Sequence, residues 1–296
     1  MAITKKKRRN EKMEKYNGHP FLLPKAGTNR MMDDFTDEEL MKISPALTKK
    51  EKEAAHSEFF YQMPAHLPEY LEQALNCEMM NPSDAFELKD YLKAMNNMGH
   101  CKVENGCCVL PNGITYAAAL IRQEGRSDEM IEFYNREFAV TDSLFYKTWF
   151  PGSHYLHYPD GAMEDFGFGR VKMKFMNQVT PEQLGTTIEE IQRNDPACIG
   201  IGGTSAIGYN LDSDEPLKAE WNTIMFYHRM TEFGREVRIR LWYGFGIDKD
   251  GFHITLPKKE EAEKIARCTL QHVAQEYTND QYLQLKFWEK YHENNE

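Results

Sequence analysis

The sequence predicts an α+β fold in which one curved antiparallel sheet wraps around a long C-terminal helix. Strand-like runs dominate the chain after about residue 100. One of them, Glu236–Phe245, alternates apolar with charged residues at the period of a strand with one buried face. The chain then closes with a helical run from about Lys258 to Tyr277, which is acidic in its first turn, as the helix dipole favours.

The part before the sheet is predicted to be a tail and a helical region. Residues 1–30 mix charges with glycine and proline, which indicates a flexible basic tail. The basic run Lys5–Arg9 could instead bind nucleic acid, but the net charge of −10 should repel phosphate backbones. Residues 31–98 form an N-terminal helical region that packs on the domain, caps a cavity or builds a homodimer interface. Its expected helices are Asp37–Ile43, Lys49–Phe60 and Leu67–Leu75, followed by a cap at Ser83 and Asp84.

Residues 99–296 are predicted to form the main domain, in which a hairpin comes first. Cys107–Leu110 and Ile114–Ile121 flank the turn Pro111-Asn112-Gly113. A helix capped at Ser127 should run to about Phe138, and Phe145–Phe150 should be a strand. The further expected strands are Gly169–Met176, Ile199–Ile207, Asn222–Met230 and Glu236–Phe245.

Composition excludes several classes of protein. No run approaches the roughly 20 apolar residues that cross a bilayer, so we expect a cytoplasmic protein that binds neither membrane nor nucleic acid. Six cysteines without a Cys-x-x-Cys pair predict reduced thiols. Cys107 and Cys108 could form a metal or redox site, but adjacent strand residues point to opposite faces, which favours packing.

His272 and Glu276 lie four residues apart on the C-terminal helix. Stepping back by threes and fours leads to Thr269, Ile265 and Ala262, the apolar face, so both side chains should point inward. A buried carboxylate is costly unless it is paired or bound to metal. The pair is therefore either a set of zinc ligands or a helix salt bridge.

The segment from Trp149 to Asp165 is a second candidate for chemistry. It holds His154, His157, Glu164 and Asp165, which could complete a two-histidine, two-carboxylate site with the helix pair. Its Pro-Gly and Pro-Asp-Gly sequences are equally typical of a surface loop.

His228 lies inside the expected strand Asn222–Met230. A lone histidine in a strand is either a core residue with satisfied hydrogen bonds or, if it faces the metal, a group suited to proton transfer.

The motifs together resemble the family of diacetylphloroglucinol hydrolase and phloretin hydrolase. The similar segments are Leu110-Pro111-Asn112-Gly113, Tyr146-Lys147-x-Trp149-x-Pro151-x-x-His154, Glu164-Asp165-x-Gly167, His228-Arg229, Glu236-x-Arg238-x-Arg240-x-Trp242-x-Gly244 and His272-x-x-x-Glu276.

This resemblance implies a helix-grip fold, like that of the major birch pollen allergen, and a bound zinc ion. The implied ligands are His154, Glu164, His272 and Glu276, with His228 as the acid/base group. Tyr146 and Tyr243 would hydrogen-bond the ring hydroxyls of the substrate. His157 would contact substrate or replace His154 as a ligand, because the ten-residue step from His154 to Glu164 is shorter than in the family.

The predicted activity is zinc-dependent hydrolysis of the carbon–carbon bond between an acyl group and a phloroglucinol ring. The expected substrate is phloretin, a small phenolic ketone, which would yield phloroglucinol and 3-(4-hydroxyphenyl)propanoate. One alternative is removal of acetyl from 2,4-diacetylphloroglucinol, which differs mainly in the size of the acyl pocket. The other is a non-enzymatic carrier of hydrophobic ligands, because fold alone does not separate the two classes.

Overall fold

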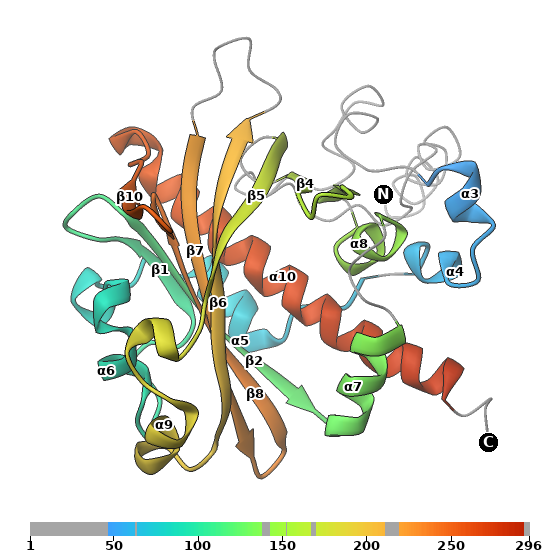
Figure 1. Cartoon of the computed structure of the whole chain (residues 1–296), viewed down its shortest axis with the longest axis horizontal. Helices are drawn as coiled ribbons and strands as arrows, with labels where there is room; N and C mark the ends of the chain where they lie inside the picture. The colour runs from blue at the N-terminus through green and yellow to red at the C-terminus, as the bar shows by residue number, and fades with distance from the viewer. Residues whose placement is uncertain are drawn as a thin grey trace, which may run out of the picture.

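The structure is a computed structural model that describes residues 47–62, 64–137, 143–151, 153–166, 170–210 and 219–292. The predicted tail of residues 1–30, the predicted helix Asp37–Ile43 and the predicted helix end at Phe138 lie outside these ranges. Within them, the chain forms one large antiparallel sheet and a long C-terminal helix (Figure 1). The predicted α+β class is therefore confirmed, as is the helix-grip architecture.

The large sheet has eight strands in the order β1-β2-β8-β7-β6-β5-β4-β3, and all neighbouring pairs are antiparallel. Its strands are β1 (Gly106–Val109), β2 (Thr115–Glu124), β3 (His154–His157), β4 (Met163–Phe166), β5 (Arg170–Val179), β6 (Cys198–Asn210), β7 (Ala219–Thr231) and β8 (Gly234–Tyr243). A separate two-stranded hairpin consists of β9 (Phe245–Asp248) and β10 (Gly251–Ile254). The predicted strands of residues 199–245 are confirmed.

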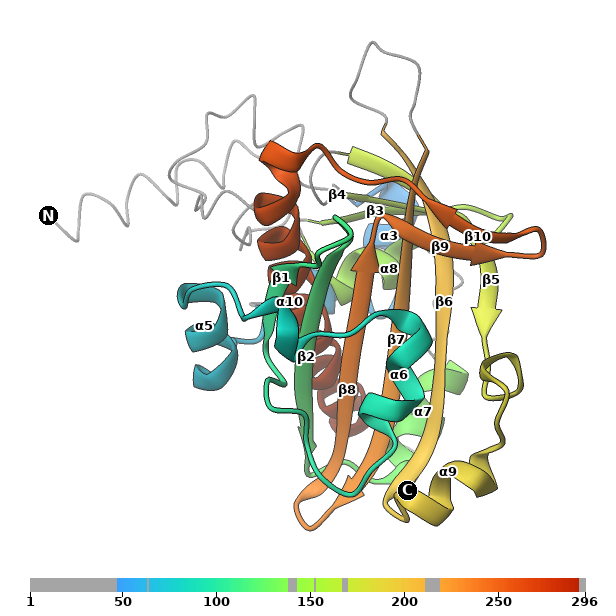
Figure 2. The same cartoon turned by 90° about the vertical axis from the view of Figure 1, so that its left-hand side faces the viewer.

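The helices lie on both faces of the sheet. They are α3 (Lys49–Lys52), α4 (Ser57–Phe60), α5 (Glu69–Asn76), α6 (Tyr91–Met95), α7 (Asp128–Glu137), α8 (Ser143–Trp149), α9 (Ile188–Asn194) and α10 (Lys259–Tyr291), with short 3-10 turns η2 (Pro82–Asp84), η3 (Leu88–Asp90) and η4 (Glu182–Leu184). Helix α6 lies in front of the sheet and α10 behind it in Figure 2. We call the face toward α10 the concave face and the other the convex face. None of the helices in the described ranges has the length and apolar character needed to span a bilayer.

The first hairpin forms as its sequence predicts. Gly113 adopts φ +88°, which a residue with a side chain rarely tolerates, and the Asn112 side chain accepts a hydrogen bond from the Ile114 amide at 3.1 Å. Cys107 packs with the apolar cluster on the concave face, whereas Cys108 packs with the cluster on the convex face. The predicted opposite orientation of the two thiols is confirmed, and all six cysteines are free.

Helix α8 corrects the prediction of a strand at Phe145–Phe150. The run is short and apolar, and such a run has no period that separates a buried helix from a buried strand. Five consecutive side chains from Leu144 to Thr148 are buried, because α8 contacts α4, β3 and α10. The helical spacing matters for function, since Tyr146 and Trp149 both reach the cavity described below.

Two further helices differ from their predictions in length. The predicted helix Lys49–Phe60 is divided into α3 and α4, and α3 begins with a capping box formed by Thr48 and Glu51. The C-terminal helix extends to Tyr291, well beyond the predicted end near Tyr277. Aromatic residues continue its buried face, since Phe287 is fully buried against Phe59.

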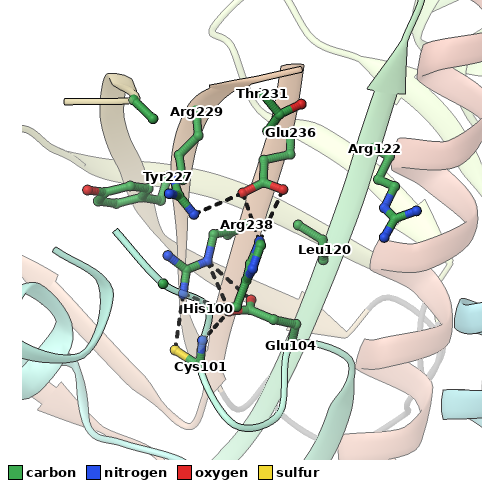
Figure 3. A network of polar contacts seen from close by, with 12 residues as sticks. His100, Cys101, Glu104, Leu120, Arg122, Tyr227, Arg229, Thr231, Glu236 and Arg238 are labelled. Carbon is green, nitrogen blue, oxygen red and sulfur yellow. Dashed lines mark hydrogen bonds and ion pairs between the residues drawn. The ribbon is translucent and has the colours of Figure 1, made fainter. Parts of the chain in front are cut away.

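The convex face is held by a network of buried charges (Figure 3). Glu104 accepts hydrogen bonds from Arg238 at 2.6 Å and from Arg240 at 2.5 Å. Arg229 pairs with Asp195 at 3.0 Å and with Glu236 at 3.3 Å. Both guanidinium groups on β8 are completely buried. The network holds the segment before β1 against the convex face of the sheet.

Candidate metal centre

Two histidines and a glutamate from distant parts of the chain meet inside the concave face. Helix α10 supplies His272 and Glu276, which are one turn apart, and β3 supplies His154. Their ligand atoms all lie within 4.8 Å of one another. The closest Glu276 oxygens lie 3.7 Å from His154 Nε2 and 3.5 Å from His272 Nε2. The predicted inward orientation of the helix pair is what brings it to β3.

His154 is held in a ring orientation and tautomer that suit a ligand. Its Nδ1 lies 2.9 Å from the carbonyl oxygen of Tyr146, so Nδ1 carries the proton and donates it to that oxygen. Nε2 is then the nitrogen with a free lone pair, and it faces the group. The imidazole also stacks on the Tyr146 ring at 3.8 Å between centroids. The hydrogen bond and the ring stacking together fix the orientation of the His154 imidazole, with Nε2 directed toward His272 and Glu276.

A fourth residue of the group is Asp165 on β4, where the resemblance had implied Glu164. Asp165 Oδ2 lies 3.2 Å from His272 Nε2 and 3.9 Å from His154 Nε2. Glu164 instead accepts a hydrogen bond from the Tyr158 hydroxyl at 2.7 Å and does not line the cavity. Adjacent strand residues face opposite sides, so only one of the two acids can reach the histidines. The alternation of side chains along a strand indicates that only one of these two acids faces the histidines, but the sequence does not show which one.

The four ionisable side chains of this group have very different pKa values, because burial and the attraction between neighbouring charges affect each of them to a different extent. Burial lowers the pKa of His154 to about 4. It acts in the same direction on His272, but the Asp165 carboxylate outweighs it and raises the pKa of His272 to about 9. Burial raises the pKa of Glu276 to about 8, whereas His272 and His154 overcome the burial of Asp165 and lower its pKa to about 2. A divalent cation would take the place of the protons on His272 and Glu276.

The donor set fits a zinc ion. Two imidazole nitrogens and one or two carboxylate oxygens are typical of catalytic zinc sites, which keep one position for water or substrate. His154 and Glu276 are buried and His272 is largely so, so water competes little for them. We therefore call the group of His154, Asp165, His272 and Glu276 the candidate metal centre.

The candidate metal centre opens into a cavity of about 350 Å³ between α10 and the concave face. Apolar side chains form much of its wall, among them Val171, Met173, Ile224, Phe226, Leu241 and Ile265. Tyr146 also lines it, and its buried hydroxyl has no hydrogen-bond partner among the described residues. A buried hydroxyl without a partner costs about 1–3 kcal/mol, so this group is suited to a ligand oxygen.

The other predicted site residues lie at different distances from the centre. Tyr243 lines the same cavity, where its hydroxyl donates to the Glu220 carboxylate. His157 does not line the cavity, and its Nδ1 is buried without a hydrogen-bond partner in the described part of the chain. His228 lies in an adjoining hollow, two residues along β7 from Phe226, which lines both spaces. The structure thus brings His154, His272 and Glu276 together, and keeps His228 and His157 outside the cavity wall.

A helix-grip domain that buries two histidines and a glutamate in its cavity defines the class, a small-molecule-binding fold with a candidate metal centre. Residues 86–162 match the family model described as the DAPG hydrolase PhiG domain. The match covers about a quarter of the chain and includes Tyr146 and His154. It supports the resemblance to diacetylphloroglucinol and phloretin hydrolases that the sequence motifs indicate. No curated protein matches the chain.

Proposed function

We propose that the protein is a zinc-dependent hydrolase that removes an acyl group from a phloroglucinol ring, with phloretin as its substrate. The observation that carries the proposal is the candidate metal centre, which lies at the wall of a largely apolar cavity. A carrier of hydrophobic ligands needs the cavity but has no use for four buried ionisable groups. The catalytic unit is then residues 99–296, which supply the centre and the cavity lining.

His154, His272 and Glu276 would hold the zinc ion, with Asp165 as a fourth ligand or as the partner that orients His272. A zinc ion held there supplies a water of lowered pKa and polarises the acyl carbonyl. The Tyr146 hydroxyl, adjacent to the group and unpartnered among the described side chains, would donate to an oxygen of the substrate. Tyr243, which lines the same cavity, would hydrogen-bond a second hydroxyl of the substrate.

Hydrolysis requires one proton to move from water to the ring. The water oxygen bonds to the acyl carbon, the carbon–carbon bond breaks, and its electron pair stays on the ring carbon, stabilised by the ring hydroxyls. His228 is neutral at pH 7, because burial and the nearby Arg235 lower its pKa to about 4. It would therefore accept the proton first and return it to the ring carbon. The products are phloroglucinol and a carboxylic acid.

A second activity, removal of acetyl from diacetylphloroglucinol, is favoured by the description of the matching family model. Both reactions need the same centre, and they differ in the length of the acyl group that the cavity must take. The cavity of about 350 Å³ has room for a larger group than acetyl, which supports phloretin.

The test is elemental analysis of the purified protein and of His272→Ala, each then incubated with phloretin and assayed for phloroglucinol by chromatography. We expect about one zinc per chain in the wild type and loss of both metal and turnover in the variant. His66→Ala is the matched control, because His66 is exposed and distant in sequence from the centre. A metal-free wild type without turnover would move the assignment to a ligand carrier.

A further inference from the structure

One carboxylate in the wall of the cavity lies outside the candidate metal centre. Glu220 is on β7, where it alternates with three other side chains that line the cavity, Asn222, Ile224 and Phe226. A carboxylate in a largely apolar wall is costly unless it is paired. In the described part of the chain, Glu220 makes no ion pair and instead accepts a hydrogen bond from the Tyr243 hydroxyl. The effect of this carboxylate on a ligand therefore depends on Tyr243.

The hydrogen bond to Glu220 determines how Tyr243 can bind a ligand. A tyrosine hydroxyl has one proton to donate and two lone pairs that accept, whereas an ionised carboxylate only accepts. Burial and the Glu220 carboxylate both raise the pKa of Tyr243, so the hydroxyl keeps its proton and directs it to Glu220. Only the lone pairs of Tyr243 remain for a ligand, and the ligand must then supply the hydrogen-bond donor.

Tyr146 has the opposite hydrogen-bonding character. Its buried hydroxyl has no partner among the described residues, so it can donate to an oxygen of the ligand. Tyr146 lies beside the metal centre, since its ring stacks on His154. Tyr243 lies nearer an earlier part of α10, because Cys268 is among the groups that raise its pKa. Cys268 precedes His272 by one helical turn, about 6 Å. The cavity thus offers a donor beside the metal centre and an acceptor farther along α10.

We infer that Glu220 is a specificity-determining residue: by holding the Tyr243 proton, it makes this end of the cavity an acceptor that selects an aromatic ring with a free hydroxyl group. This inference rests on the proposed function, which supplies the phloroglucinol ring. One ring oxygen accepts a hydrogen bond from Tyr146, and another ring hydroxyl donates to Tyr243. A ring whose hydroxyls are methylated has no proton to donate, so it leaves the lone pairs of Tyr243 without a partner.

The test measures equilibrium binding of two ligands to the full chain, phloroglucinol and its trimethyl ether. The ether keeps the ring oxygens as acceptors but cannot donate. Glu220→Met removes the carboxylate at a similar side-chain length, and Glu220→Gln takes its place if the methionine variant does not fold. Glu232→Met is the matched control, because Glu232 is exposed just beyond the end of β7 and does not line the cavity. Each variant is also made in a Tyr243→Phe background.

If Glu220 acts through Tyr243, Glu220→Met should weaken phloroglucinol binding by roughly 10- to 100-fold. Binding of the ether should be equal or tighter, because the released Tyr243 hydroxyl can donate to an ether oxygen. In the Tyr243→Phe background, the same substitution should have no further effect on phloroglucinol binding. Equal weakening of both ligands, or an additive effect in that background, would mean that Glu220 has only a structural role and would overturn the inference.

The binding measurements also separate this inference from the proposed function. Wild-type protein that binds phloroglucinol with this pattern but cleaves no acylphloroglucinol would contradict the proposed function and leave the inference standing. Cleavage of phloretin, with equal phloroglucinol binding by wild type and Glu220→Met, would have the reverse meaning. A wild type that binds no phloroglucinol would overturn the inference whatever its turnover.

Discussion

Strand β8 carries two opposite kinds of surface on one backbone. Its side chains Glu236, Arg238, Arg240 and Trp242 face the convex side, whereas Val237, Ile239, Leu241 and Tyr243 face α10 and the cavity. The convex side holds the charges, and the part of the concave side that β8 covers is mostly apolar. The ionisable groups of the concave side come instead from α10, β3 and β4, at the candidate metal centre.

The two groups of buried charges differ in how they are balanced. On the convex face, Glu104 lies between Arg238 and Arg240, and Arg229 lies between Asp195 and Glu236, so opposite charges alternate. At the candidate metal centre, both carboxylates face histidines that bind protons with very different affinity. On the convex face, arginine side chains neutralise the carboxylates and the ion pairs hold the elements together. The candidate metal centre has no arginine or lysine among the described residues, so its carboxylates and imidazoles are suited to binding a metal cation.

The largest expected effect of a single change is at the candidate metal centre. Glu276→Gln removes the charge of a ligand but keeps its shape, so the protein should fold without binding zinc and turn over no acylphloroglucinol above background. Metal analysis and a chromatographic assay measure both quantities. The convex-face variant Glu236→Gln is the control and should keep its zinc. Equal loss of metal in the two variants would contradict the division between the faces.

A smaller loss is expected for the proposed acid/base group. His228→Ala should lower turnover by roughly 100- to 10,000-fold, because a positioned proton-transfer group contributes about this much. Zinc content should be unchanged, since His228 lies in the hollow and not at the centre. The measurement is kcat with phloretin beside metal analysis of the same samples. Turnover equal to that of the wild type would remove His228 from the mechanism.

Much of the architecture was predictable because it depends on local patterns. The alternation of β8 and the turn at Asn112-Gly113 are properties of neighbouring residues, and both formed as expected. Helix α8 was not predictable in this way, since its burial on all sides leaves no polar face to set a period. The tertiary contacts of α8, which no local window contains, decided its conformation.

The candidate metal centre shows the same limit. His272 and Glu276 could be placed inward from helical spacing alone, and the structure places them beside His154. The choice between Glu164 and Asp165 depends on which face of β4 meets α10, and this follows only from the register of β3, β4 and β5. A shift of one residue would exchange the two acids.

A substitution in the charge network of the convex face should lower the stability of the protein and leave its turnover unchanged. Glu104→Gln leaves two buried guanidinium groups without a carboxylate, which should lower the free energy of unfolding by about 3–5 kcal/mol. Urea denaturation measures this loss, and a kcat equal to that of the wild type would separate stability from catalysis. Glu87→Gln, at an exposed pair with Lys89, is the control and should leave the urea midpoint unchanged. A change in stability no larger than that of this control would mean that the network does not fasten the face.

The same network should make the protein sensitive to acid. Burial would raise the pKa of Glu104, but Arg240 and Arg238 overcome it and lower the pKa from 4.5 to about 2. Because the folded-state pKa is the lower one, the contribution to stability is complete above pH 4.5 and disappears as the pH falls toward 2. The shift corresponds to about 3 kcal/mol. Urea denaturation at a series of pH values should therefore show wild type and Glu104→Gln converging below pH 4.5. A gap between them that stays constant down to pH 2.5 would show that charge does not give Glu104 its role.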